Sequence, residues 1–308
     1  MTKHRKSIRA LGQRFERWCR ERSLGPAFPI KPRPLAAFLV VRCGEIQGSA
    51  KSLRSWVSKL KSYSRLLGLP WLDDGEAAEV NLVLQHLEFF DQNPVRRVRP
   101  LTLDLLGQIQ DCAAVLDLDK TMMSVGHDSL MRGGELCSGL RVQDLIWSAN
   151  RRAVTITLSR SKCHRKGGPQ TITIRDYGSY SGARLLRKHM YRHNLWQQPT
   201  SFLFPSFKNK KLDWNCCRPT SQLRYAIKRA VRLIGLNPDF YSGHSLRAGG
   251  ATDLFRANVS YANIKKFGRW KSDAALIYYR DEDAVAEAAA LGFASLVEGR
   301  LSPKNAVA

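Results

Sequence analysis

The ten residues from Asp91 to Pro100 divide the chain, because they hold two prolines and three arginines and show no hydrophobic periodicity. Proline lacks the backbone N–H that helices and inner strands need, so such a stretch interrupts regular structure. The chain has 308 residues, which is enough for two ordinary domains. We therefore expect a first domain over residues 1–91, a linker over 92–100 and a second domain over 101–308.

Before this break, apolar side chains recur at intervals of three and four residues, as is typical of amphipathic helices. The pattern predicts four helices, over Ile8–Arg22, Leu35–Arg42, Ser49–Leu67 and Glu76–Phe90. A turn punctuated by prolines lies between the first two of them. The first domain should therefore be a small helical bundle.

After the break the pattern is mixed. Ala153–Leu158 and Gln170–Ile174 alternate apolar and polar residues as strands do, and they flank a basic tip over Ser159–Gly168. Beyond Tyr180 the pattern is mostly helical to about Leu296, apart from a loop around residues 201–213 that is rich in Phe, Pro and Lys. We expect a mainly α fold with a small antiparallel β-sheet in the second domain.

The chain carries a large positive charge, since 50 Lys and Arg residues against 26 Asp and Glu residues give +24 at pH 7. The excess occurs on both sides of the break, so both domains should contact a polyanion, and nucleic acid is the commonest large polyanion inside cells. A protein that is merely soluble and basic is the simpler alternative. Candidate phosphate contacts in the first domain and the linker are Lys51, Arg54, Lys59, Arg96, Arg97 and Arg99.

The composition also argues against several other classes. The longest apolar run near the N-terminus, Leu35–Val41, is far too short to cross a bilayer, and the basic first residues precede no secretory core. The seven cysteines are scattered and form no CxxC pair of a zinc site. We find no P-loop and no GxGxxG motif. We therefore expect an intracellular protein without a membrane partner.

Three segments of the second domain stand out: Met131–Leu136, Gly243–Arg247 and Gly268–Tyr279. The residues of these segments, their order and their separation resemble the catalytic domain of tyrosine recombinases, the phage-integrase and Cre-like enzymes. The amino-acid sequences of the last two segments are similar to those of recombinases of Crypton and DIRS mobile elements. The resemblance spans residues 1–297, since the helical bundle, the linker and the mixed second domain also match the two-domain DNA clamp of the family.

This resemblance implies a set of catalytic residues. Arg132 corresponds to the first arginine of the family, and Glu135 to its supporting carboxylate, although Arg141 lies in a similar motif. Lys162 corresponds to the lysine of the hairpin, where a cationic acid must give a proton to a departing 5′ oxygen. The full implied set is Arg132, Lys162, His244, Arg247, Trp270 and the nucleophile Tyr279. The competitors of Lys162, namely Arg160, Arg165 and Lys166, would otherwise grip the DNA backbone, as would Arg269 and Lys271.

The chemistry of these residues suits attack on a phosphodiester. Negative charge gathers on the non-bridging oxygens, and the guanidinium groups of Arg132 and Arg247 would stabilise it. Tyrosine has a pKa near 10, so its proton must be removed or its anion stabilised during the attack. Tyr279 stands nine residues after Trp270, which is the spacing of the family. The adjacent Tyr278 is a rival nucleophile, and an ordinary structural role is the alternative for each residue taken alone.

The resemblance therefore implies a site-specific DNA recombinase that cuts and rejoins double-stranded DNA through a 3′-phosphotyrosyl intermediate, without metal or cofactor. The protein would act as a homo-oligomer, a dimer on each site and a tetramer in synapsis, in the nucleus of a eukaryote or the cytoplasm or nucleoid of a bacterium. Two alternatives stay open: relaxation of DNA as by type IB topoisomerases, and a catalytically silent DNA-binding derivative. An Ala-rich helix from about Ala284 to Leu296 would dock on a neighbouring subunit or on its own domain.

Overall fold

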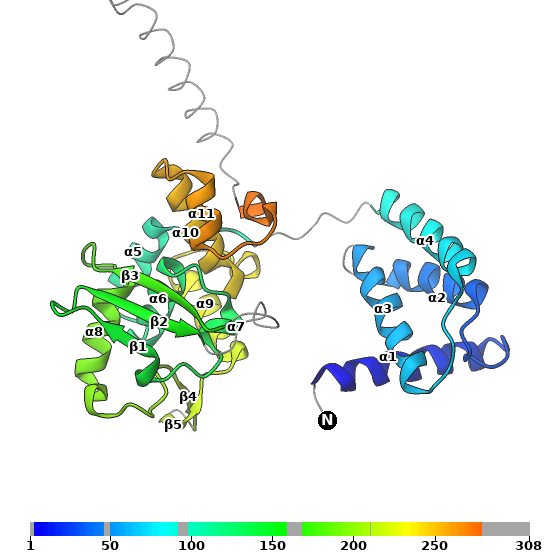
Figure 1. Cartoon of the computed structure of the whole chain (residues 1–308), viewed down its shortest axis with the longest axis horizontal. Helices are drawn as coiled ribbons and strands as arrows, with labels where there is room; N and C mark the ends of the chain where they lie inside the picture. The colour runs from blue at the N-terminus through cyan, green and yellow to red at the C-terminus, as the bar shows by residue number, and fades with distance from the viewer. Residues whose placement is uncertain (1–2, 46–49, 92–97, 159–167, 210, 279–308) are drawn as a thin grey trace, which may run out of the picture. The chain divides into compact units, whose positions relative to one another are not determined.

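The computed structural model describes residues 3–45, 50–91, 98–158, 168–209 and 211–278. The chain divides into two compact units, Met1–Arg96 and Arg97–Ala308, and each is considered by itself (Figure 1). This division falls within the ten-residue stretch that lacks periodicity in the sequence.

The first unit consists of helices, as the periodicity predicts. They are α1 (Lys3–Glu21), α2 (Pro32–Glu45), α3 (Lys51–Leu66) and α4 (Asp74–Phe89). Helix α2 begins three residues earlier than expected, because Pro32 and Pro34 occupy its first turn, where a missing N–H leaves no hydrogen bond unmade. Helix α4 begins with a capping box, in which the side chains of Asp73 and Glu76 each accept a hydrogen bond from the other residue's backbone N–H.

The apolar faces of these helices form one core. Phe15, Phe38, Leu53 and Leu84, one from each helix, are almost completely buried. At the end of α3, Tyr63 is buried in this core, whereas Leu67, which follows the helix, is 44% exposed. The unit is thus held together by its own hydrophobic core.

The second unit is larger and mixed. Its helices are α5 (Leu103–Asp111), α6 (Asp117–Asp128), α7 (Gly133–Leu136), α8 (Gly182–Arg192), α9 (Thr220–Leu233), α10 (Gly243–Arg256) and α11 (Tyr261–Phe267). Short 3₁₀ turns are η1 (Val142–Asp144), η3 (Leu195–Gln197), η4 (Pro238–Phe240) and η5 (Asp273–Tyr278).

Helix α6 is the centre of this unit, since every residue from Leu118 to His127 is buried. It packs against α8 and against α10. The approach of α10 is so close that a Cβ on Gly250 would lie 2.4 Å from the carbonyl oxygen of His127. Only glycine therefore fits at this position of α10.

Two small antiparallel sheets complete the unit. The first has the order β1-β2-β3, formed by Leu145–Trp147, Ala153–Leu158 and Gln170–Arg175, with Leu158 opposite Gln170. The alternation in the sequence predicted its two longer strands. The loop expected around residues 201–213 is wrong in part, because β4 (Pro205–Lys208) and β5 (Lys211–Cys217) form a hairpin there.

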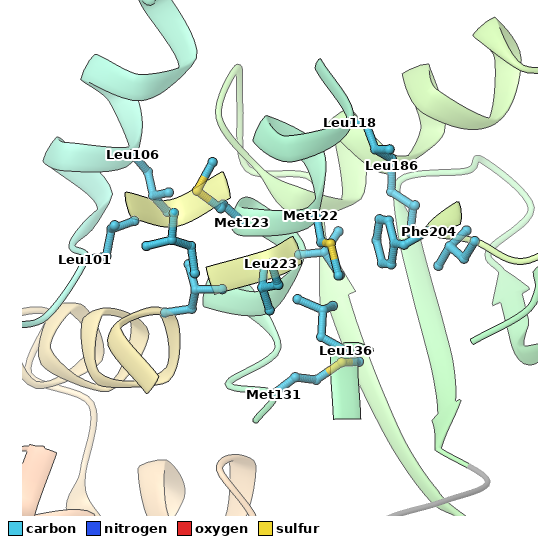
Figure 2. Packing of buried hydrophobic residues seen from close by; sticks show 14 of the residues in the cluster. Leu101, Leu106, Leu118, Met122, Met123, Met131, Leu136, Leu186, Phe204 and Leu223 are labelled. Carbon is cyan, nitrogen blue, oxygen red and sulfur yellow. The ribbon is translucent and has the colours of Figure 1, made fainter. Parts of the chain in front are cut away.

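The core of the second unit lies between these elements, and Figure 2 shows it from close by. Met122 of α6 lies near Leu223 of α9 and Leu136 of α7, Met123 lies toward Leu106 of α5, and Leu186 of α8 lies at the opposite side of the cluster. Leu136 is four residues after Arg132, so the same packing fixes the short helix that follows this arginine. The fold class expected from the sequence is confirmed.

Candidate active site

Arg132 and Glu135 are joined by two hydrogen bonds. Arg132 lies immediately before α7, and its Nη1 donates a hydrogen bond to Oε1 of Glu135 at 2.7 Å. Its backbone N–H donates to Oε2 of the same carboxylate at 3.0 Å. The side chain of Glu135 is 4% exposed and that of Arg132 is 28% exposed. The buried carboxylate therefore binds the guanidinium on its inner side, while the outer side of the guanidinium reaches solvent.

His244 and Arg247 lie in the first turns of α10, as the sequence predicted for a helix start. Ser242 caps the helix and accepts a hydrogen bond from the backbone N–H of His244. The two side chains differ in exposure, because His244 is exposed whereas Arg247 is 1% exposed. Arg247 donates from Nη1 to the carbonyl of Leu130 and from Nη2 to that of Gly268, each at 2.5 Å.

Trp270 covers Arg247. The centre of the Trp270 ring lies 3.9 Å from the guanidinium carbon, a cation–π contact. The same ring packs on Gly268, where an added Cβ would lie 1.7 Å from Cζ3 of Trp270. The turn from Gly268 to Trp270 therefore joins the buried arginine to the segment that leads to Tyr279.

A cavity of about 530 Å³ opens beside these residues. Arg132, Glu135 and His244 line it together with Thr220 and Arg224 of α9. The N-terminus of α10 also borders it, and a helix N-terminus attracts anions. Two arginines and a helix N-terminus around one cavity suit a phosphate group better than a cation.

The electrostatics of the site agree with that view. Although His244 is exposed on one side, the cavity wall desolvates its ring and lowers the pKa of His244 below its ordinary value, and the charges of Arg247 and Arg132 lower it further, so the imidazole is neutral at pH 7. Burial opposes ionisation of Glu135, but the hydrogen bond from the Arg132 backbone and the charges of Arg269 and Arg132 outweigh it and lower the pKa of that carboxyl. The site thus holds a neutral imidazole, which can accept a proton, beside fixed positive charges.

Arg141, the other arginine in a motif of this kind, does not line that cavity. Its guanidinium lies 4.0 Å from the centre of the Phe202 ring and donates to the carbonyl of Thr200. Its backbone N–H donates to Asp144 at 2.8 Å. The structure therefore places Arg132, and not Arg141, beside His244.

Several predicted residues lie outside the described part of the chain, as does the predicted helix over Ala284–Leu296. They are Arg96, Arg97, Arg160, Lys162, Arg165, Lys166 and Tyr279. Tyr278 ends η5, and Lys51 begins α3, but neither side chain is described.

The remaining residues predicted to bind DNA have different surroundings. Arg54 of α3 pairs with Glu88 of α4 through two hydrogen bonds, of 2.6 and 3.1 Å, and Lys59 is half-buried on the same helix. Arg99 and Lys271 are exposed. Arg269 is not, since its side chain is 9% exposed and its Nη2 donates to Oε2 of Glu135 at 2.9 Å. Arg269 therefore belongs to the interior of the site.

Sequence reasoning missed Arg224. The signal was present, because α9 is an amphipathic basic helix that directly precedes the segment of His244. Nothing in the sequence says which of its arginines faces the cavity. Among the described residues, no group of three His, Cys, Asp or Glu side chains could hold a metal ion.

A family model described as the phage integrase family matches residues 105–285. The chain belongs to the phage integrase family. The resemblance seen in the motifs is thereby confirmed, whereas the finer likeness to Crypton and DIRS recombinases stays a prediction. Comparison with curated proteins gives no match. Among the described residues, no helix is long and apolar enough to cross a membrane.

Solved structures of family members share the fold. The Tn1549 transposon integrase in complex with transposon right end DNA has a TM-score of 0.59 and 18% identity, covering 94% of this chain and 98% of that one. The same integrase with circular intermediate DNA gives 0.57 and 16%, with 90% and 98% covered. A lambda integrase dimer bound to a COC′ core site gives 0.52 and 21%, with 83% and 66% covered. At these identities the likeness establishes the fold alone.

Proposed function

We propose that this chain is a site-specific DNA recombinase that cuts and rejoins DNA through a 3′-phosphotyrosyl intermediate formed by Tyr279. The observation that carries the proposal is the cavity lined by Arg132 and His244, next to which Trp270 covers Arg247 nine residues before Tyr279. Fixed guanidinium groups, a neutral imidazole and a nearby tyrosine are the groups that attack on a phosphodiester requires.

The substrate of this proposal is double-stranded DNA. The net charge of +24 favours a polyanion, and the similar integrases were solved with transposon and core-site DNA. Residues 1–91 would be a helical DNA-binding domain, 92–100 a linker and 101–308 the catalytic domain. Protomers would assemble on DNA as a dimer on each site and a tetramer in synapsis.

Cleavage forms one bond and breaks one bond. The phenolic oxygen of Tyr279 attacks the phosphorus while His244 accepts the phenolic proton. Arg132, whose guanidinium lines the cavity, stabilises the negative charge on the non-bridging oxygens, and Glu135 holds it in place. Arg247 is buried under Trp270 and adds its positive charge from the interior beside the cavity. The bond from phosphorus to the 5′ oxygen breaks, and Lys162 gives that oxygen a proton.

Rejoining is the reverse reaction with a new strand. The free 5′ hydroxyl of a partner strand attacks the phosphotyrosyl phosphorus, Lys162 takes the proton from the hydroxyl, and His244 returns a proton to Tyr279. The phosphotyrosyl ester and the DNA linkage are both phosphodiesters, so the exchange is close to balanced in energy. No external energy source is needed.

The test is covalent trapping on nicked DNA, which on cleavage releases a short fragment with a free 5′ hydroxyl and so cannot reseal. We expect wild-type protein and Tyr278→Phe to form a protein–DNA adduct, and Tyr279→Phe to bind the DNA without forming one. An adduct that vanishes in Tyr278→Phe and persists in Tyr279→Phe would overturn the choice of nucleophile. Binding without any adduct on cleavable sites would favour a silent DNA-binding derivative.

Product topology separates recombination from relaxation. On a supercoiled plasmid that carries two sites, recombination gives deletion or inversion products, whereas an activity of the topoisomerase IB type gives relaxed circles with an unchanged order of segments. Recombinant joints that depend on Tyr279 support the proposal. Relaxed circles alone would replace it with the second activity.

A further inference from the structure

Arg269 adopts a backbone conformation that its side chain does not favour. It lies between Gly268 and Trp270 with a φ of +60°, in the left-handed region where residues other than glycine are uncommon. Such a conformation persists only when surrounding contacts hold it. The contacts of Arg269 therefore indicate what the turn is built to maintain.

These contacts lead directly to the Arg132 site. Nη2 of Arg269 donates to Oε2 of Glu135 at 2.9 Å, while Nη1 of Arg132 donates to Oε1 of the same carboxylate at 2.7 Å. The two guanidinium groups thus bind opposite oxygens of one carboxylate that is 4% exposed. Rotation of the carboxylate away from Arg132 would also break its ion pair with Arg269.

The second arginine is connected through the same turn. The carbonyl of Leu130 accepts hydrogen bonds from Nη1 of Arg247 at 2.5 Å and from Nη2 of Arg269 at 3.4 Å. The carbonyl of Gly268 accepts from Nη2 of Arg247. Arg269 therefore lies where the segment before Arg132 meets the turn that carries Trp270 over Arg247.

We propose that Arg269 is a positioning residue, which acts through Glu135 to hold Arg132 toward the phosphate and through the turn at 268–270 to hold Trp270 over Arg247. The inference rests on the proposed function and deepens it. Arg269 does not grip the DNA backbone, because its guanidinium is bound inside the protein. The positive charge of Arg269 is paired with Glu135, whereas the guanidinium of Arg132 is 28% exposed and lines the cavity.

The test compares two residues that share the left-handed conformation. Arg269→Gly removes the guanidinium and relieves the backbone, so a turn that needs only this conformation is unharmed. Asn258→Gly makes the same backbone change at an exposed residue with a φ of +56°, at the end of α10. Arg269→Lys keeps a positive charge for Glu135 but loses the planar guanidinium, whose nitrogens also donate to the carbonyls of Ser129, Phe267 and Leu130.

We expect Arg269→Gly to slow single-turnover cleavage of nicked DNA about tenfold or more, while the Kd for that DNA changes less than about twofold. Arg269→Lys should lie between Arg269→Gly and wild type, and Asn258→Gly should match wild type. Combining Arg269→Gly with Glu135→Gln should slow cleavage by less than the product of the two separate effects, because one of the two routes from Arg269 runs through the same carboxylate. Wild-type cleavage by Arg269→Gly, or equal losses of cleavage and affinity, would overturn the inference.

A second measurement does not depend on cleavage. Titration of the Glu135 carboxyl by ¹³C NMR in the DNA-free protein should give a higher pKa in Arg269→Gly than in wild type or Asn258→Gly. An unchanged Glu135 pKa would refute the role of Arg269 as the partner of that carboxylate. If wild-type protein forms no adduct on any DNA, the proposed function fails, and this titration still decides the structural part of the inference.

Discussion

The buried His127 gives a prediction about stability that the structure allows us to quantify. Its Nδ1 lies 2.9 Å from Oδ1 of Asp128, and its Nε2 lies 2.9 Å from Oδ2 of Asp253. Those carboxylates also accept hydrogen bonds from the backbone N–H groups of Gly182 and Leu103, the first residues of α8 and α5. One imidazolium thus bridges the two carboxylates that link four helices of the second unit.

Burial disfavours the charged imidazole, but the hydrogen bonds and charges of Asp128 and Asp253 outweigh burial and raise the pKa of His127 to about 9, from 6.5. A group whose pKa is raised by folding stabilises the protein below its unfolded pKa, and that contribution is lost as the pH rises through its folded pKa. Between pH 7 and pH 9.5 the linkage amounts to about 2 to 3 kcal/mol.

The perturbation is therefore the change from pH 7 to pH 9.5, compared between wild type and His127→Gln by urea unfolding of the DNA-free chain. We expect the free energy of unfolding of the second unit to fall by about 2 to 3 kcal/mol more in wild type than in the variant. His244→Gln is the matched control, because the pKa of His244 lies below 6.5 and its charge does not change in this range.

NMR titration of the His127 ring in wild type covers the case in which His127→Gln does not fold. A ring pKa at or below 6.5, or equal pH dependence in wild type and a folded His127→Gln, would show that the two carboxylates do not stabilise a charged His127. Tyr177, whose hydroxyl donates to Asp128 at 2.8 Å, has a raised pKa, so it stays protonated in the folded protein over this range.

Three further predictions concern the DNA reaction. Arg132→Ala should lower the single-turnover rate of adduct formation about 10²- to 10³-fold, with little change in the Kd for DNA. Arg141→Ala removes an arginine that does not line the cavity and should leave that rate near the wild-type value. Equal losses in both variants would contradict the assignment of Arg132. Gly268→Ala should displace Trp270 from Arg247, because the new Cβ would lie 1.7 Å from the ring, and so abolish cleavage, while Gly44→Ala, whose Cβ meets nothing within 4 Å, should not. The affinity for DNA, measured by fluorescence anisotropy, should fall about 10³-fold between 50 and 200 mM salt, and an affinity independent of salt would argue against contacts to phosphate by both units.

The sequence predicted the elements whose pattern is local. The stripe of Ile8, Leu11, Phe15 and Trp18 repeats at helical spacing and is buried in α1 as expected. Alternation identified β2 and β3 because one face of each strand carries apolar residues. The hairpin of β4 and β5 escaped notice, because Pro, Lys and Asp in this stretch are residues that usually mark loops.

For the site, the sequence predicted the types and the spacing of the residues better than it predicted their burial and their hydrogen-bond partners. The resemblance to the family singled out Arg132, His244 and Trp270; in the structure Arg132 and His244 line one cavity, and Trp270 packs on Arg247 of the same helix as His244. The burial of Arg269 against Glu135 joins residues 134 positions apart, and no local pattern reports such a contact. The charge of Arg269 suggested a contact with DNA, but in the tertiary structure Arg269 forms an ion pair with Glu135.

The most direct test of the account is to identify the amino acid and the DNA end joined in one covalent adduct. Protein trapped on nicked DNA would be digested with protease and nuclease, and the linked peptide sequenced by mass spectrometry. We expect a nucleotide joined through its 3′ phosphate to Tyr279, with a free hydroxyl on the 5′ end of the released strand. A link to Tyr278 or to any other residue, or attachment through a 5′ phosphate, would contradict it.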